Sequence, residues 1–217
     1  MSGADLLLAL HALGLITDDR YPRWWRHYGE WWVAIEAILT QQTRWEKVEA
    51  SVNNLVQIGL DTPAKLLGAE VWTIAQAIAP AGFYNQKADR IVRLLRAIER
   101  DFGSFEGFAG EVSREWLLEQ KGIGFESADS ILCYGCRRAV MVVDSYTQRL
   151  LSALGNEFDD YNELQSYLMN GVESEFDRIY KIVPIELELT YAYFHGLIVE
   201  FCKKQKRGAI VARDLLR

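Results

Sequence analysis

Cysteine, proline and long apolar runs are all scarce in this sequence of 217 residues, which has three cysteines and four prolines. An odd number of cysteines without repeated spacing excludes the disulfide framework of a small secreted domain and fits a reducing cytoplasm. The apolar stretch 6–16 is interrupted by His11, is too short to span a bilayer and follows no basic segment. We therefore expect a cytoplasmic protein with no membrane partner.

Basic charge is also in deficit, since the formal net charge is −6. On its own, this balance disfavours a protein that coats nucleic acid or anionic membranes. However, residues 156–188 alone carry nine acids and two bases, which leaves the rest of the chain at +1. Basic residues recur every three or four positions along one predicted helix, which places most of them on one helical side: Lys87, Arg90, Arg93, Arg96 and Arg100. A solvated helix face explains such a run equally well.

Half of the residues are apolar and a quarter are charged, which excludes disordered and low-complexity classes. With so few prolines and little β-type alternation, the chain is predicted to be all-α. The expected helices are 4–13, 31–40 running on toward 58, 73–79, 85–102, 111–120, 126–136, 146–153, 160–170 and 186–206. Residues 140–143 form an apolar, strand-like stretch, and Asp144 and Asp160 stand where a carboxylate caps a helix.

Residues 116–132 predict two helices joined by a tight turn. Gly122 and Gly124 flank Ile123, so the turn can take left-handed dihedrals, and the helix that follows offers unpaired N–H groups to a phosphate. Lys121 adds a positive charge beside the turn. Because many helix pairs end in glycine caps, this segment alone does not decide between a binding site and an ordinary turn.

Asp144 follows the apolar stretch directly and begins a predicted helix. A helix-hairpin-helix followed by an apolar run ending in Val-Asp resembles the base-excision DNA glycosylase superfamily that includes endonuclease III. The segment Leu39–Thr43 is similar to its Gln-x-Thr motif, and Gly82–Ala88 to its Gly-x-Tyr-x-x-Lys-Ala motif. The resemblance implies that Asp144 is the catalytic carboxylate. Its role is either to stabilise an oxocarbenium-like sugar or to position or deprotonate the attacking water.

The resemblance is closer to the bacterial 3-methyladenine DNA glycosylases of the third type. The shared segments are Phe83–Lys87, Arg114–Leu118, Gln120–Gly124, Glu126–Asp129, Met141–Asp144 and Phe194–Gly196. This likeness implies two helical subdomains with a DNA-binding cleft between them. Residues 30–140 would form a six-helix barrel with the hairpin, and residues 1–29 plus 141–217 the second subdomain. The implied function is hydrolysis of the N-glycosidic bond of alkylated purines, chiefly 3-methyladenine, in base excision repair.

Departures from the wider superfamily bear on the reaction and the cofactors. Bifunctional members carry a nucleophilic lysine two residues beyond the second hairpin glycine, where this chain has Glu126, so we expect no lyase activity. Only Cys202 lies beyond residue 136, so no four-cysteine iron–sulfur cluster is expected there. Cys133 and Cys136 are interpreted as core thiols, and no metal is expected. The one cofactor left open is a monovalent cation on the hairpin carbonyls.

Five of the seven tryptophans fall within 22 residues, at positions 24, 25, 31, 32 and 45. Trp31 and Trp32 open an apolar helix and are expected in its core. The 3-methyladenine branch builds its base pocket from aromatic residues, which implies base-binding roles for Trp24, Trp25 and Trp45, with Lys203 reaching the same pocket. Because 3-methyladenine is cationic, an indole face contributes up to about 2 kcal/mol to its binding when water is excluded.

The expected partner is double-stranded DNA with a damaged base, bound by a monomer that associates with the bacterial nucleoid during repair. Gln41 would fill the space left by the flipped nucleotide, as its counterpart does in relatives, and the hairpin residues Lys121 to Gly124 would hold a phosphate. Residues 156–188 are expected to face away from DNA.

Two other functions remain open at this point. A glycosylase for mispaired or oxidised bases would share the fold, the hairpin and Asp144, but would not need the tryptophans. A non-enzymatic helix-hairpin-helix DNA-binding protein would have no use for Asp144.

Overall fold

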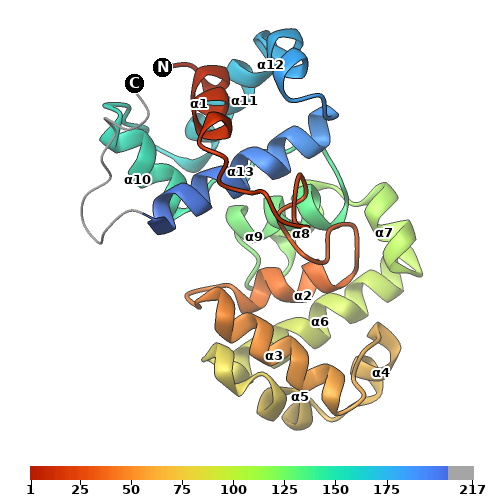
Figure 1. The fold of residues 1–217 in the computed structure, drawn as a ribbon. Helices are drawn as coiled ribbons and strands as arrows, with labels where there is room; N and C mark the ends of the chain where they lie inside the picture. The colour runs from red at the N-terminus through yellow and green to blue at the C-terminus, as the bar shows by residue number, and fades with distance from the viewer. Residues whose placement is uncertain (205–217) are drawn as a thin grey trace. The chain divides into compact units, whose positions relative to one another are not determined.

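The computed structural model describes residues 1–204 (Figure 1), and this part of the chain is helical without a strand, which confirms the all-α prediction. The helices are α1 (Gly3–Ala12), α2 (Trp32–Leu39), α3 (Trp45–Gln57), α4 (Pro63–Gly68), α5 (Val71–Ala77), η1 (Ala79–Ala81), α6 (Tyr84–Phe102), α7 (Phe105–Glu111), α8 (Arg114–Glu119), α9 (Phe125–Ser130), η2 (Ile131–Gly135), α10 (Ser145–Ala153), α11 (Tyr161–Ser174), α12 (Phe176–Ile182) and α13 (Leu187–Lys204).

The chain divides into two compact units. The central unit is Gly29–Cys136, and the terminal unit combines Met1–Tyr28 with the described residues from Arg137 onward. The division expected from the sequence lay at residues 29/30 and 140/141, and the cleft expected between subdomains stays a prediction.

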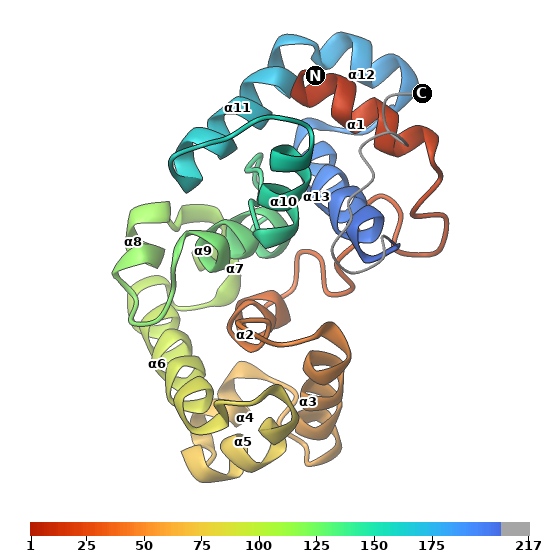
Figure 2. The ribbon, with the colours of Figure 1, turned by 90° about the vertical axis from the view of Figure 1, so that its left-hand side faces the viewer.

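The central unit is organised around the long helix α6, which packs against α2, α4, α5 and α7. Figure 2 shows α6 running along this unit from α5 toward α8. Helix α6 forms because apolar residues recur at helical spacing: Ile91, Leu95 and Ile98 are buried, whereas Arg93 and Arg96 on the opposite side are exposed. This amphipathic pattern fixes which face of α6 meets the other helices.

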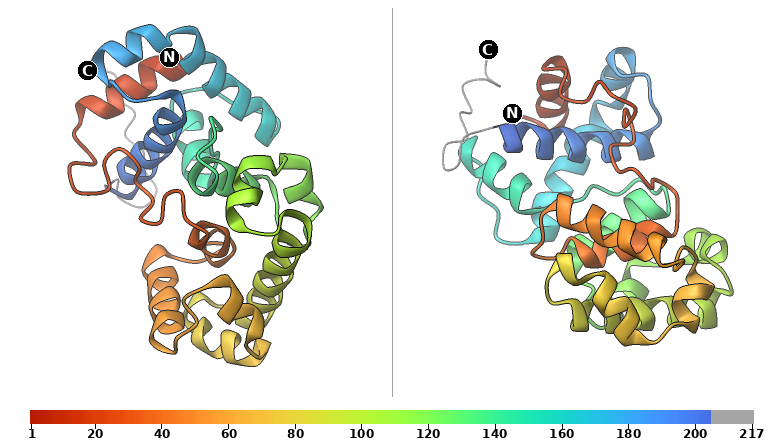
Figure 3. Two further views of the ribbon diagram at one scale, coloured as in Figure 1. Left: turned by 90° about the vertical axis from the view of Figure 1, so that its right-hand side faces the viewer. Right: turned by 60° about the horizontal axis from the view of Figure 1, so that its bottom comes forward.

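The terminal unit is organised around α13, of which twelve residues are buried. Helices α1 and α10 pack against α13, and α1 also contacts α11 and α12 (Figure 3). A capping box between Ser2 and Asp5 begins α1. Within residues 1–204, no single helix is long and apolar enough to span a membrane. The pair α12 and α13, bent by 74° at its break, meets that test by length and composition only.

The helix predicted from residue 31 toward 58 is wrong at its middle, because α2 ends at Leu39 and α3 begins at Trp45. Gln42 in the connection has a φ of 53°, a left-handed conformation that no helix continues through. The hydroxyl of Thr43 donates to the carbonyl of Ala81 (2.6 Å), which holds the connection away from a helical path.

Two other sequence expectations also differ from the structure. The helix expected over 126–136 changes from α to π geometry at Ile131. The stretch 140–143 is not a strand, although Met141, Val142 and Val143 are buried as expected. The last residues of the helix expected over 186–206 lie outside the described residues.

Candidate functional site

Asp144 is the N-cap of α10. Its Oδ1 accepts hydrogen bonds from the backbone N–H of Thr147 (2.8 Å) and from the Thr147 hydroxyl (2.9 Å). The buried segment Met141–Val143 leads directly into this position. The N-cap contacts therefore fix the carboxylate through one oxygen and leave the other, Oδ2, for a different partner.

That partner is His195 of α13, whose Nε2 lies 3.5 Å from Asp144 Oδ2. The Asp144 side chain is only 14% exposed. Burial by itself would raise the pKa of Asp144, but His195 and Thr147 outweigh burial, so the pKa lies below its ordinary value of 3.8. The carboxylate is thus ionised at neutral pH and suited to stabilise positive charge or to accept a proton.

Trp24 lies in the connection between α1 and α2, with a φ of 58°. Its ring meets the His195 ring edge-on, with centroids 5.4 Å apart. The indole also rests on Gly196, where an added Cβ would lie 2.4 Å from Trp24 Cγ, so no side chain fits at that position. His195 therefore contacts both Asp144 and Trp24, and brings the predicted catalytic residue and one predicted base-binding residue into a single cluster.

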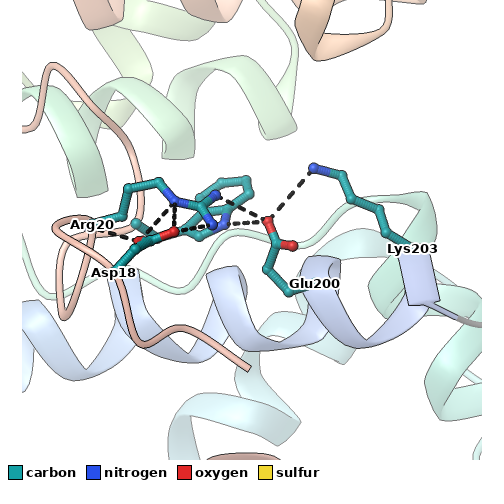
Figure 4. A network of polar contacts seen from close by, with 5 residues as sticks. Asp18, Arg20, Glu200 and Lys203 are labelled. Carbon is teal, nitrogen blue, oxygen red and sulfur yellow. Dashed lines mark hydrogen bonds and ion pairs between the residues drawn. The ribbon is translucent and has the colours of Figure 1, made fainter. Parts of the chain in front are cut away.

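A polar network adjoins this cluster (Figure 4). Glu200 Oε1 accepts from Trp24 Nε1 (3.0 Å) and from Arg20 Nη1 (3.2 Å), and it lies 3.7 Å from Lys203 Nζ. Asp18 binds the opposite side of the Arg20 guanidinium, at 2.8 Å. Lys203 Nζ lies 5.7 Å from the centre of the Trp24 ring, so the structure places this predicted base-binding lysine beside the indole.

The other two predicted base-binding tryptophans have different surroundings. Trp25 is buried, with 6% of its surface exposed, and meets Trp24 edge-on at 6.2 Å. Trp45 is the first residue of α3 in the central unit and is half-buried. Roles for Trp25 and Trp45 in base binding stay predictions. Trp31 and Trp32 stack on each other at 4.1 Å, with Trp32 buried.

The predicted hairpin is formed by α8, α9 and the turn between them. Gly122 has a φ of 89°, which favours glycine, and Ile123 is buried beneath the turn. Lys121 and Gly124 are exposed beside them, and Gly124 is the N-cap of α9. The buried isoleucine anchors the turn, and the glycines on either side of it are exposed.

Gln41 is bound to this hairpin. Its Nε2 donates to the carbonyl of Gly122 (2.9 Å) and to Ser127 Oγ (3.0 Å), and its Oε1 accepts from Arg90 (2.7 Å). The structure thus brings Gln41 and the hairpin together, and adds Arg90 and Ser127, whose contacts with Gln41 no sequence motif indicated. If a monovalent cation binds the hairpin carbonyls, Gly122 offers it one remaining lone pair.

Lys87 does not belong to an exposed basic face, so this part of the charge interpretation is wrong. Its side chain is 1% exposed, and the three N–H groups of its Nζ are shared among four oxygens that lie 2.7 to 2.9 Å away. These oxygens are the carbonyls of Leu39, Gln41 and Ala81 and the hydroxyl of Thr43. Lys87 therefore closes the C-terminal end of α2. Burial and the nearby Arg90 lower the pKa of Lys87 to about 8.

Two further sequence positions bear on the predicted reaction and cofactors. Glu126, which stands where bifunctional relatives carry lysine, lies exposed in the first turn of α9. Cys133 is fully buried, and burial raises the pKa of its thiol, as expected for a core residue. Across residues 1–204, no group of three or more His, Cys, Asp or Glu side chains is arranged to hold a metal ion.

The hairpin and the fold define a helix-hairpin-helix protein. Residues 35–174 match the family described as HhH-GPD superfamily base excision DNA repair protein. The chain therefore belongs to the HhH-GPD superfamily of base excision DNA repair proteins.

Individual relatives agree with this assignment. The crystal structure of the H. pylori 3-methyladenine DNA glycosylase MagIII, bound to 1,N6-ethenoadenine, has a TM-score of 0.92 and 40% sequence identity, over 95% of this chain and 100% of that one. A Methanocaldococcus jannaschii protein named "Putative DNA repair glycosylase MJ1434" is 37% identical over 85% of this chain and 81% of its own length. Endonuclease III of Thermotoga maritima is 31% identical over 63% of this chain and 62% of its own length.

Proposed function

We propose that this base excision repair glycosylase is monofunctional and releases alkylated purines, chiefly 3-methyladenine, from double-stranded DNA. The proposal rests mainly on the ionised carboxylate of Asp144. His195 contacts this carboxylate and also meets the indole of Trp24 edge-on. The likeness to the MagIII structure supports the choice of alkylated purines.

Recognition starts from the damaged base. A glycosylase extrudes the nucleotide at a cost of a few kcal/mol and holds the base against flat side chains. The electron-rich face of Trp24 favours a cationic base by up to about 2 kcal/mol when water is excluded, and a neutral adenine by much less. Gln41 would leave the hairpin to fill the vacated space, and the backbone around Lys121–Gly124 would hold a phosphate.

The chemistry is hydrolysis at C1′ of the sugar. The glycosidic bond breaks, its electron pair leaves with the base, and the cationic 3-methyladenine departs as a neutral molecule. A water oxygen forms the new bond to C1′ and loses a proton to Asp144 or to solvent. Asp144 acts either by stabilising the positive charge that develops on the sugar or by positioning and deprotonating the water.

Glu126 supports the absence of lyase activity, because a carboxylate cannot form the Schiff base that leads to strand cleavage. We further propose that the protein works as a cytoplasmic monomer. It would hold no four-cysteine iron–sulfur cluster, since that motif is absent from its sequence, and we propose that it needs no metal.

Chromatography of bases released from methylated DNA tests the substrate. We expect free 3-methyladenine, abasic sites that break only after alkali treatment, and no enzyme–DNA adduct trapped by borohydride. Release of none of the methylated bases would contradict the proposal. Release of only mispaired thymine or oxidised purine would point to a different glycosylase, and DNA binding without any release to a non-enzymatic protein. A borohydride-trapped adduct would contradict the monofunctional assignment.

A further inference from the structure

Three donors converge on a single oxygen of Glu200. The indole N–H of Trp24, the guanidinium of Arg20 and the ammonium of Lys203 lie 3.0, 3.2 and 3.7 Å from its Oε1. The carboxylate is 15% exposed. Burial would raise the pKa of Glu200, but Trp24, Lys203 and Arg20 together lower it below the ordinary value of 4.5, so Glu200 is ionised at neutral pH.

Lys203 creates an electrostatic difficulty for a cationic base. Its Nζ lies 5.7 Å from the centre of the Trp24 ring, at the limit of a cation–π contact. A cationic base stacked on the same indole would meet this like charge, and that of Arg20 as well. The carboxylate of Glu200 lies against both cations, and together with Asp18 on the other side of Arg20 it offsets their charge.

Glu200 also determines how the indole is held. A hydrogen bond from an N–H to an ionised acceptor is roughly twice as strong as one between neutral groups, so it fixes the ring in one orientation. Donation to an anion also shifts electron density from the N–H toward the ring, and the cation–π attraction depends on the negative face of the ring.

From this convergence we infer that Glu200 is a positioning residue that gives the Trp24 indole its preference for cationic over neutral purines. The inference rests on the proposed function only in taking Trp24 as the surface on which the base stacks. Glu200 acts through Trp24, Arg20 and Lys203, without contacting the base.

The test is the binding of two small molecules that differ in charge. Quenching of tryptophan fluorescence would give the dissociation constants of the 3,9-dimethyladeninium cation and of neutral 9-methyladenine. Glu200→Gln keeps a side-chain oxygen that can accept the indole N–H but removes the negative charge. We expect the dissociation constant of the cation to rise about tenfold, which is the change in an equilibrium constant that one pKa unit represents. The dissociation constant of the neutral purine should stay within about twofold of the wild-type value.

Glu188→Gln is the matched control, because it removes the same charge from an exposed position twelve residues earlier on α13. Twelve helical residues span about 18 Å, beyond the screening length of about 8 Å at physiological salt, so neither dissociation constant should change. Lys203→Met supplies a second test in the opposite direction: it should tighten binding of the cation and leave the neutral purine unchanged.

The inference is overturned if wild-type protein binds both molecules equally, or if Glu200→Gln weakens both to the same degree, as a purely structural role would. It is also overturned if Lys203→Met leaves the affinity for the cation unchanged. If wild-type protein releases no alkylated base but Glu200→Gln selectively weakens binding of the cation, the proposed function is contradicted and the role of Glu200 is supported.

Discussion

At the scale of single residues, the state of Asp144 depends on His195, which is 51 residues further along the chain. Asp144 could be predicted because its position after an apolar run and before a helix is a local signal. The contact with His195 could not, since it exists only because α10 packs against α13. His195 lies in Phe194–Gly196, one of the segments that resemble the 3-methyladenine branch, and only this resemblance pointed to His195.

Substitution of His195 is expected to raise the pKa of Asp144. His195 helps to lower that pKa against the opposing effect of burial, so in His195→Gln the effect of burial is less strongly opposed. In wild-type protein the carboxylate stays ionised down to a pH below its ordinary pKa of 3.8, whereas in the variant it takes up its proton at a higher pH. NMR titration of the Asp144 side-chain carbon measures both values, and equal pKa values would contradict the assigned contact.

At the scale of helices, the ends of a helix that are marked in the local sequence were easier to predict than a break between two helices. Helix α6 is long and strongly amphipathic, and its predicted range of 85–102 is close to Tyr84–Phe102. The short helices α4, α7 and α12 were not predicted, although Thr62-Pro63 and Ser104 are recognisable helix starts. The break between α2 and α3 could not be read locally, because Lys87 and Ala81, which are distant in sequence, stabilise it.

Lys87→Met should destabilise the protein. The methionine fills a similar space but removes the lysine donor to the carbonyls of Leu39 and Gln41 at the end of α2, and each buried group left without a donor costs about 1–3 kcal/mol. We expect the free energy of unfolding to fall by about 2–4 kcal/mol in urea denaturation. Arg93→Met, at an exposed position on the same helix, should change it by less than about 0.5 kcal/mol. Similar values for both variants would show that Lys87 has no such role.

At the scale of the whole molecule, composition and motifs were sufficient to predict the fold class and the superfamily. The net charge of −6 gave a poor guide to the partner, because an average over the chain hides the concentration of acids in 156–188. The division into two compact units follows from packing between distant segments, such as α1 with α11, and such contacts leave no local pattern in a single sequence.

The uneven charge predicts how DNA binding responds to neutralisation. Asp177 and Glu186 are exposed within the acidic stretch, which is proposed to face away from DNA. The double substitution Asp177→Asn with Glu186→Gln should therefore leave the DNA dissociation constant within about twofold at physiological salt.

Lys121→Met should weaken binding and reduce its dependence on salt, since a phosphate contact is lost. Fluorescence anisotropy over a range of salt concentrations measures both, and markedly tighter binding by the double variant would place the acids near DNA.

Hydrolysis is proposed to depend on the carboxylate of Asp144, and single-turnover release of 3-methyladenine measures that dependence. Asn caps a helix about as well as Asp, so Asp144→Asn preserves the start of α10 while removing the charge. Asp160→Asn makes the same change at the N-cap of α11 and serves as the control. We expect Asp144→Asn to slow release at least about 100-fold, and Asp160→Asn to act at the wild-type rate. Release by Asp144→Asn at the wild-type rate would contradict this proposal.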